Sequence, residues 1–490
     1  MIPLTLQQVA QVTGGRVHPG GSDGAAAGLT VSGSVVTDSR EVAPGGLYVA
    51  RRGDHADGHD YLAAAADRGA VGALTNRESD VLPCVVLDED PARLSPRPDR
   101  PPYDAVTRGF AALGREVVDR CTAAGGLRIV GITGSSGKTS TKDLMAQVLS
   151  GLGPTLAPEA SYNSEVGVPL TVCRLTPDTA YLVAEMGASG AGHIAHLTTV
   201  APPQVAVVLN VGSAHLGEFG SREAIGRAKA ELVQSLPAGG LAVLNADDPV
   251  VAAMAGDAAA VGARTLLVGR GTNADLRAVD VTTDTRGRAS CTVRGPGTPE
   301  EGVPVALRLV GEHHVGNALA VAAVAHEWGM PWEQVAQALG TAEARARWRM
   351  EVTERPDGLV VVNDAYNANP DSTAAALRAL AAMRTPDGRL VAVLGGMLEL
   401  GADSDAEHAR VGALAAALGV DHLVTVGQLA EPAATAYLEG GGAEATFLPD
   451  RHEARAFLAD HLGPADVVLL KSSRDSGLRL LGDELAGVGP

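Results

Sequence analysis

Apolar runs of strand length alternate with stretches of helix length through the middle of the chain. We predict strands at 127–133, 181–187, 204–210 and 240–248, and a helix at 142–153. Continuous apolar strands separated by helices are typical of a parallel sheet that is covered on both faces. Apolar and polar positions alternate more strictly between about 275 and 310, which predicts an antiparallel patch. The middle of the chain is therefore expected to be an α/β domain.

A second alternating region lies toward the C-terminus. Apolar strands are predicted at 359–366, 389–397, 422–428 and 465–473, with helices at 371–383 and 405–418 between them. This order predicts a small doubly wound α/β domain, and in such domains ligands lie at the carboxyl ends of the strands.

The N-terminal region shows shorter elements. Thr5 is expected to cap a helix over 6–13, which stops at Gly14. A strand is predicted at 46–50 and a helix at 61–68. This part of the chain is therefore expected to be a small mixed α/β domain.

One proline-rich run separates the N-terminal elements from the middle of the chain. The run from Pro91 to Pro102 should be extended, because proline fixes φ and disfavours a helix before it. At roughly 150 residues per domain, 490 residues make about three domains. We predict their boundaries at 1–103, 104–342 and 343–490.

Composition narrows the class of protein. The chain has 39 Lys and Arg against 57 Asp and Glu, a net charge of −18, which argues against a protein that coats nucleic acid. Neither a run of 18 apolar residues nor a basic N-terminal leader is present, so neither membrane insertion nor secretion is expected. The 4 cysteines form no C-x-x-C pair, which favours a reducing compartment and excludes a cysteine-rich zinc site. We expect a cytoplasmic protein.

The strongest motif follows the first strand of the middle region. It consists of Gly134, Ser135, Ser136, Gly137, Lys138, Thr139 and Ser140. Glycines let backbone N–H groups turn inward around phosphate oxygens, and the N-terminus of the following helix adds positive potential. Lys138 is expected to reach the β and γ phosphates, and the Thr139 hydroxyl a magnesium ion. The motif is shorter than the common phosphate loop, and the alternative is a glycine-rich turn before a helix.

Three further residues are candidates for a metal site. They are Glu185 at the end of a strand, His215 in a loop, and Lys229 on a predicted helix. Each has an ordinary alternative: a helix-cap partner, a loop histidine, and a solvated lysine or one paired with Glu231. A carboxylate at the end of an apolar strand costs free energy unless it is used, so Glu185 carries the strongest physical argument.

Ordered motifs along the chain resemble the Mur ligase family. They are DSREVAPGGLYVARRGDHADGHDY, GITGSSGKTSTKD, EMGAS, NVGSAHLGEFGS, AKAEL, NADDP, GEHHVGN, RWRME, NDAYNANPDS and MLELG. The stretches DAYNANPDS and MLELG are similar to those of family members that add D-alanyl-D-alanine to UDP-N-acetylmuramoyl-tripeptide. The resemblance implies a three-domain enzyme with a substrate-binding N-terminal domain, a central ATPase-like domain and a Rossmann-like C-terminal domain.

The resemblance also implies roles for individual residues. For the UDP substrate they are Asp38, Ser39, Arg40, Asn163 and Ser164; for ATP, beyond the phosphate loop, Asn245, Asn317, Arg349 and Asp364; for the dipeptide, Tyr366, Asn367, Asn369, Ser372, Lys471 and Arg474. Two alternatives stay open: Arg40 as a surface arginine, and Asn245 as part of a strand-end turn. The sequence departs from the family pattern at Ser135, Ser136, Ser189, His314, Gly396 and Ser472.

The implied reaction transfers the γ-phosphoryl of ATP to a carboxylate, and the amine of D-alanyl-D-alanine then attacks the acyl phosphate. It implies ATP and two Mg²⁺, one of them bound by His215 and a carbamylated Lys229, with Lys138 and Arg349 offsetting phosphate charge. A monomer is expected. Alternatives are a paralogue that joins a different amine or carboxylate and a nucleotide-binding regulator that kept the fold. The complete set of Lys138, Glu185, His215, Lys229 and Arg349 disfavours the regulator.

Overall fold

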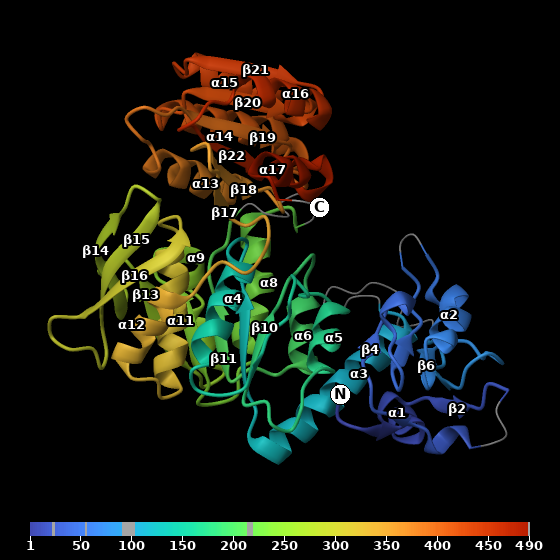
Figure 1. Cartoon of the computed structure of the whole chain (residues 1–490). Coiled ribbons are helices and arrows are strands. Elements are labelled where there is room, and N and C mark those ends of the chain that lie inside the picture. The colour runs from blue at the N-terminus through green and yellow to red at the C-terminus, as the bar shows by residue number, and fades with distance from the viewer. Residues whose placement is uncertain (22–24, 54–55, 91–102, 213–218, 489–490) are drawn as a thin grey trace.

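The computed structural model describes residues 1–21, 25–53, 56–90, 103–212 and 219–488. The proline-rich run at 91–102 lies outside these residues. Three groups of elements follow one another along the chain, and each is built around its own large sheet. The C-terminal group lies above the central group in Figure 1, and the N-terminal group lies beside the central one. The predicted three-part α/β fold is confirmed.

The N-terminal part holds a five-stranded sheet in the order β2-β7-β6-β5-β4 and a two-stranded ribbon, β1-β3. The strands are β1 (Leu4–Thr5), β2 (Arg16–His18), β3 (Thr30–Val31), β4 (Val35–Val36), β5 (Leu47–Val49), β6 (Gly72–Thr75) and β7 (Cys84–Val86), and the helices are α1 (Leu6–Thr13) and α2 (Leu62–Asp67). As predicted, Thr5 caps α1 and Gly14 ends it, at φ 73°. The structure adds that Gln8 completes a capping box with Thr5.

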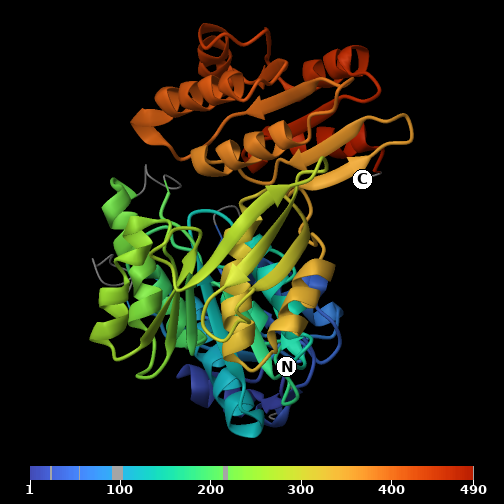
Figure 2. The same ribbon diagram turned by 90° about the vertical axis from the view of Figure 1, so that its left-hand side faces the viewer.

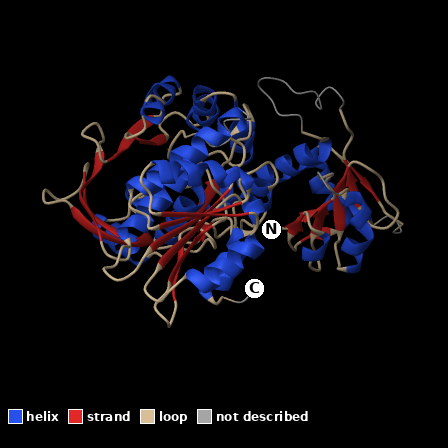
Figure 3. Ribbon diagram, turned by 90° about the horizontal axis from the view of Figure 1, so that it is seen from above, coloured by secondary structure: helices blue, strands red, loops and turns tan. Residues whose placement is uncertain are grey.

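A long helix, α3 (Ala105–Gly125), joins the N-terminal and central parts. It begins at the Asp104 cap and ends at Gly126, which adopts a left-handed conformation. It packs against α1 on one side and against α5 and α6 of the central part on the other. In the view from above, the N-terminal sheet stands apart from the other two groups (Figure 3).

The central part is a nine-stranded sheet in the order β16-β15-β14-β13-β12-β11-β8-β10-β9. Its strands are β8 (Arg128–Thr133), β9 (Thr155–Leu156), β10 (Tyr181–Glu185), β11 (Val205–Val208), β12 (Leu241–Asn245), β13 (Arg264–Gly269), β14 (Leu276–Thr283), β15 (Arg288–Arg294) and β16 (Val303–Val310). Its helices are α4 (Lys138–Leu149), α5 (Gly167–Val172), α6 (His193–Val200), α8 (Arg222–Gln234), α9 (Pro249–Ala252), α10 (Ala255–Ala260), α11 (His314–Glu327) and α12 (Trp332–Thr341).

Two predictions for this sheet can be checked. The antiparallel patch is confirmed, because β14 pairs with β15 and β15 with β16 in antiparallel register. The predicted start of the first helix at 142 is wrong: α4 begins at Lys138. Gly137 turns the chain at φ 80°, so the phosphate loop runs directly into the helix and its last residues form the first helical turn.

The C-terminal part is a six-stranded sheet in the order β17-β18-β22-β19-β20-β21. Its strands are β17 (Glu351–Glu354), β18 (Val360–Asp364), β19 (Leu390–Gly395), β20 (His422–Val426), β21 (Glu444–Leu448) and β22 (Val467–Lys471), and its helices are α13 (Pro370–Ala382), α14 (Ser404–Ala417), α15 (Glu431–Glu439), α16 (Arg451–His461) and α17 (Leu478–Ala486). The four predicted strands are present. The sequence analysis missed β17 and β21, because these edge strands carry exposed polar residues instead of a continuous apolar run.

The carboxyl ends of β8 and β10 in the central sheet face those of β18 and β22 in the C-terminal sheet across one junction. A second bridge is the β14–β15 hairpin, which reaches the C-terminal part in Figure 2. At its turn, Gly287 lies beside Met383, next to the end of α13. Among the described residues, no helix has the length and apolar composition needed to cross a membrane.

Candidate functional site

A cavity of about 550 Å³ lies between the central and C-terminal sheets. Loops at the carboxyl ends of strands from both sheets line it, which is where a doubly wound fold places its ligands. Predicted site residues in its wall are Ser135, Ser136, Gly137, Lys138, Thr139, Ser140, Asn163, Ser164, Glu185, Lys229, Asn317, Arg349, Asp364, Tyr366, Asn367, Asn369, Ser372, Lys471 and Arg474. Residues predicted for three different ligands thus meet in one place.

Hydrogen bonds to the residue that follows β11 fix the conformation of the phosphate loop. Asn210, just after β11, accepts a hydrogen bond from the Ser135 backbone N–H at 3.1 Å and, through Oδ1, one from the Ser136 N–H at 2.9 Å. The φ of 80° at Gly137 favours glycine, and a Cβ there would lie 3.2 Å from Asn317 Oδ1, a tight contact. The loop therefore keeps a fixed shape at the N-terminus of α4, where the helix dipole favours an anion.

Lys138 projects from the first turn of α4 along the loop. Its Nζ donates to the Gly134 carbonyl at 2.6 Å, which keeps the ammonium within the cavity. Desolvation lowers its pKa, Arg349 acts in the same direction, and Glu185 opposes both. An ammonium with a lowered pKa has little local compensation, and phosphate oxygens would supply it.

Glu185, at the end of β10, is only 1% exposed. Its Oε1 accepts a hydrogen bond from Asn163 Nδ2 at 2.7 Å, while its Oε2 is buried and has no hydrogen-bond partner among the described residues. A buried carboxylate oxygen without a partner is costly, and a cation would satisfy it. Thr139 Oγ1, which is 2.9 Å from Ser161 Oγ, is a second oxygen in the same cavity wall. These oxygens fit a hard cation such as Mg²⁺.

Lys229 is 5% exposed on α8 and lines the same cavity. Burial, and then the nearby Lys138, lowers its pKa to about 7. Glu231, the alternative partner, instead accepts hydrogen bonds from the backbone N–H groups of Gly192 at 2.6 Å and Ala195 at 2.9 Å. No ion pair of Lys229 occurs within the described ranges, so a surface pairing does not account for it. His215 lies outside the described residues, and no cluster of three His, Cys, Asp or Glu forms a metal site among those described.

The C-terminal part sends Arg349 into the cavity. Its Nη2 donates to Ser161 Oγ at 3.0 Å, and its guanidinium stacks on the Tyr366 ring with its carbon 4.4 Å from the centroid. Trp348 and Met350, on either side of it, have φ values of 59° and 49°. Left-handed backbone costs a non-glycine residue roughly 1–2 kcal/mol, so the surrounding structure must enforce this segment.

A buried ion pair joins the ends of two neighbouring strands of the C-terminal sheet. Lys471 Nζ, at the end of β22, lies 2.8 Å from Asp364 Oδ2, at the end of β18, and donates to the Asn367 carbonyl at 2.6 Å. Asp364 Oδ1 accepts from the Met350 N–H at 3.0 Å. These contacts give both side chains a structural task; their predicted ligand contacts stay predictions.

Two other residues that were predicted to bind the dipeptide lie at the start of a helix. Asn369 Oδ1 accepts from the Ser372 N–H at 2.8 Å, and Ser372 Oγ accepts from the Asn369 N–H at 3.1 Å, which is a capping box for α13. The N-terminal turn of α13 thereby lies at the cavity wall. The guanidinium carbon of Arg474 also lies near the Tyr366 ring, 5.7 Å from its centroid.

Several predicted site residues do not line the cavity. Asn245 donates to the Leu209 carbonyl at 2.8 Å and accepts from the Asp247 N–H at 3.0 Å, as expected for the strand-end turn that was its alternative. Asp38 and Arg40 pair at 2.6 Å in the N-terminal part, where the Arg40 side chain is 83% exposed. Arg40 lowers the pKa of Asp38 to about 2. Their roles, and that of the buried Ser39 between them, stay predictions.

The sequence analysis missed three residues that shape the site. Ser161 links Thr139 to Arg349, and a lone serine in a loop gives no signal for that. Lys142 is fully buried and donates to the Pro158 carbonyl at 2.6 Å, which secures the loop that carries Ser161. His313 lines the cavity, and burial lowers its pKa to about 4. It lies within the GEHHVGN motif, so the motif marked its position but not its use.

Family models match the chain in three stretches. The Mur ligase family catalytic domain matches residues 32–97, the Mur ligase middle domain residues 132–325, and the Mur ligase glutamate ligase domain residues 348–474. The three stretches correspond to the N-terminal, central and C-terminal parts of the fold.

Curated proteins and solved structures are similar over nearly the whole length. UDP-N-acetylmuramoyl-tripeptide--D-alanyl-D-alanine ligase from Mycobacterium tuberculosis is 46% identical over 507 residues, covering 99% of this chain and 98% of that protein. The Escherichia coli protein of the same name is 34% identical, covering 89% of this chain and 88% of that protein. The structure of MurF from Acinetobacter baumannii superposes with a TM-score of 0.84 at 30% identity, covering 99% of both chains. MurF ligase from Thermotoga maritima in complex with ADP gives 0.76 at 28% identity, covering 94% of this chain and 98% of that one.

Proposed function

Because this chain belongs to the Mur ligase family, we propose that it joins D-alanyl-D-alanine to UDP-N-acetylmuramoyl-tripeptide at the expense of ATP, in peptidoglycan precursor synthesis. The observation that carries the proposal is the cavity, where the phosphate loop, Glu185 and Lys229 of the central part meet Arg349 and Tyr366 of the C-terminal part. The 46% identity to a curated ligase over nearly the full chain supports the choice of substrates.

Lys138 and Arg349 are proposed to bind the phosphates from opposite sides of the junction. ATP supplies the phosphoryl group that activates the tripeptide carboxylate as an acyl phosphate, and Mg²⁺ offsets the charge that gathers there. Two cations, Lys138 from the loop and Arg349 from the other domain, lower the repulsion between the carboxylate and the phosphate. The contact from Arg349 to Ser161 supports this arrangement, because it already spans the junction.

Two magnesium ions are proposed. Thr139 and Glu185 would hold one, and His215 with a carbamylated Lys229 the other. Carbamylation requires a neutral amine, and a pKa of about 7 makes the neutral form abundant near neutral pH. The carbamate would replace a cation, which Mg²⁺ repels, by two anionic oxygens, which are hard ligands.

The remaining wall of the cavity is proposed to hold the dipeptide and the substrate peptide. Tyr366, Asn367, Asn369 and Ser372 would line the pocket for D-alanyl-D-alanine, and Asn163 and Ser164 would meet the UDP substrate, whose nucleotide binds the N-terminal domain. Closure of the two domains over the cavity would also keep water from the acyl phosphate. We place the domain boundaries at 1–103, 104–342 and 343–490 and the reaction in the cytoplasm, in keeping with four unpaired cysteines.

The test is phosphate release by the purified chain with ATP and Mg²⁺. Release should require both UDP-N-acetylmuramoyl-tripeptide and D-alanyl-D-alanine, and it should stop when either is omitted. Single D-alanine and L-alanyl-L-alanine serve as matched controls for the amine. Equal turnover with single amino acids would favour the paralogue that uses another amine, and ATP binding without turnover would favour a regulator.

A further inference from the structure

The segment that carries Arg349 is held in an unfavourable backbone conformation by contacts with α17 and with the end of β18. Arg349 lies between two non-glycine residues with positive φ, Trp348 at 59° and Met350 at 49°. Such a conformation persists only where the surroundings determine it. The contacts that determine it therefore set the direction of the guanidinium.

On one side, the Trp348 indole is bound by a carboxylate. Trp348 Nε1 lies 3.0 Å from both oxygens of Asp483, on α17. Asp483 is 7% exposed, and Asn363 Nδ2 and Arg347 Nη2 also contact it, at 3.3 Å and 2.9 Å. These contacts hold the carboxylate in place, so the indole has one defined position.

Two guanidinium groups also pack near the indole ring. The guanidinium carbons of Arg347 and Arg479 lie 5.0 Å and 5.5 Å from the ring centroid of Trp348. Trp348 is only half-buried, so packing in a core does not explain this arrangement. Its backbone is engaged as well, since its N–H donates to Glu351 and its carbonyl accepts from the Tyr366 N–H.

On the other side, a second carboxylate holds the backbone, because Met350 N donates to Asp364 Oδ1 at 3.0 Å. Arg349 thus lies between two residues that are each anchored to a carboxylate. Its side chain then reaches Tyr366 at 4.4 Å and Ser161 at 3.0 Å in the central domain. Few degrees of freedom are left to the segment.

We infer that Asp483 and the Trp348 indole are positioning residues that aim the Arg349 guanidinium across the domain junction. Neither lines the cavity, so both act through Arg349. The inference rests on the proposed function in one respect: Arg349 is taken to contact the transferred phosphoryl group. When the guanidinium loses this orientation, the rate of phosphoryl transfer falls more than ATP affinity does, since Lys138 and the phosphate loop still bind the nucleotide.

The test compares Asp483→Asn with Asp466→Asn. Both aspartates are buried and accept hydrogen bonds in the same domain, but Asp466 lies at the opposite edge of the sheet, where it pairs with Arg389. Asp483→Asn should lower kcat roughly 10-fold and change the KM for ATP by less than about 2-fold. Both variants should lower the Tm by a similar amount, and Asp466→Asn should leave kcat unchanged. Equal effects of the two variants on kcat would reduce Asp483 to a structural residue and overturn the inference.

Two further measurements distinguish an effect on the orientation of Arg349 from an effect on the stability of the fold. In an Arg349→Ala background, Asp483→Asn should cause no additional loss of kcat, because the residue through which it acts is gone; additive losses would contradict the inference. A crystal structure of Asp483→Asn should show the guanidinium away from Ser161 Oγ, and an unchanged contact would overturn the inference. This structural result does not depend on turnover, so it is distinguishable from failure of the proposed function, which wild-type turnover tests.

Discussion

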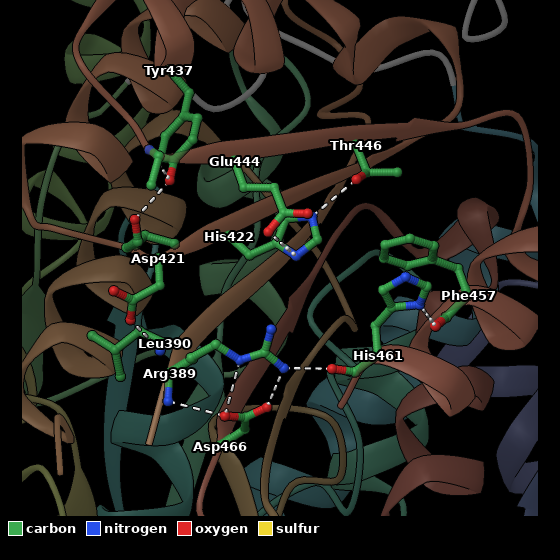
Figure 4. A network of polar contacts seen from close by, with 12 residues as sticks. Arg389, Leu390, Asp421, His422, Tyr437, Glu444, Thr446, Phe457, His461 and Asp466 are labelled. Atoms are coloured by element: carbon green, nitrogen blue, oxygen red, sulfur yellow. Dashed lines mark hydrogen bonds and ion pairs between the residues drawn. The ribbon is translucent and has the colours of Figure 1, made fainter. Parts of the chain in front are cut away.

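Two clusters of polar side chains in this structure differ in how their hydrogen bonds are satisfied: the cavity, and a set at the amino ends of strands in the C-terminal sheet. We call the second set, Arg389, Asp421, His422, Glu444, Thr446 and Asp466, the amino-edge network (Figure 4). In it Asp466 accepts hydrogen bonds from the Arg389 backbone N–H at 3.0 Å, from Arg389 Nη2 at 2.7 Å and from the Gly463 N–H at 2.8 Å. His422 Nε2 lies 2.9 Å from Thr446 Oγ1.

The cavity contains similar residue types with far fewer partners. Glu185 keeps a buried oxygen without a hydrogen bond among the described residues, while Lys138 donates to a carbonyl of its own loop. Lys229, with its lowered pKa, has no ion pair within the same ranges. Buried polar groups are normally hydrogen-bonded, and each exception calls for an explanation.

The difference separates structural polar groups from functional ones. In the amino-edge network the buried Asp466 carboxylate accepts hydrogen bonds at both oxygens from Arg389 and Gly463, which stabilises the fold. In the cavity the unused capacity is what a phosphate, a metal ion or a carbon dioxide molecule can satisfy. Asp364 and Lys471 lie at the cavity and are paired at 2.8 Å, so each has a partner within the fold, while their predicted ligand contacts stay predictions.

The largest effect is expected from Lys138→Ala. Removal of one charge-stabilising donor from the cavity should lower kcat on the order of 10²-fold or more. The fold should stay intact, because among the described residues the Lys138 side chain donates to one group, the Gly134 carbonyl of its own loop. Steady-state phosphate release and a thermal melt measure the two quantities. A kcat within a factor of about three of the wild-type value would contradict the functional role proposed for the phosphate loop.

Arg349→Ala should follow, with a loss of turnover of about 10²-fold. ATP affinity should fall much less, because Arg349 comes from the C-terminal domain and contacts the central domain across the junction, while the phosphate loop of the central domain still binds the nucleotide. Single-turnover kinetics and equilibrium nucleotide binding separate the two. If affinity falls as much as turnover, Arg349 binds the ground state and the argument from the junction fails.

Lys229→Ala should cost roughly 10–100-fold in activity, as loss of a group that supports a metal site does. Added formate or acetate should restore part of it by supplying carboxylate oxygens. In the wild-type enzyme, stimulation by bicarbonate should increase as the pH rises through about 7, since the neutral amine reacts with carbon dioxide. A variant with normal turnover, or no response to short carboxylates, would leave Lys229 as an ordinary buried lysine.

The smallest effect on activity is expected from Asp466→Asn in the amino-edge network. The free energy of unfolding should fall by about 1–3 kcal/mol, because the buried Asp466 loses its charge and with it the ionised acceptor for Arg389 and Gly463, while kcat stays unchanged. Burial alone would raise the pKa of Asp466, but the hydrogen bonds from Arg389 and Gly463 outweigh it and lower the pKa.

This pKa shift gives the sign of a pH effect. The carboxyl group is more acidic in the folded state, so its contribution to stability is full above the unfolded-state value and is lost as the pH falls through the lower folded-state value. Urea titrations between about pH 5 and 2 should show wild type and Asp466→Asn converging. Divergence toward acid pH would contradict the assignment of this group as a stabilising ion-pair acceptor.

Local sequence patterns determined much of this protein. The Thr5 cap of α1, the predicted apolar strands of the two large sheets and the glycine-lysine loop all depend on residues a few positions apart, so period and spacing were sufficient to predict them. The edge strands β17 and β21 were not predicted from the sequence, because their stability comes from pairing with a neighbouring strand, and their sequence lacks an apolar run.

Only the tertiary structure decided which of the candidate groups are unsatisfied. Arg349 reaches Ser161 across 188 positions of sequence, and Trp348 meets Asp483 across 135. The lowered pKa of Lys229 and the unpartnered oxygen of Glu185 arise from burial by elements far apart in the chain. Desolvation and hydrogen-bond satisfaction are properties of a packed neighbourhood, and no stretch of sequence contains that neighbourhood.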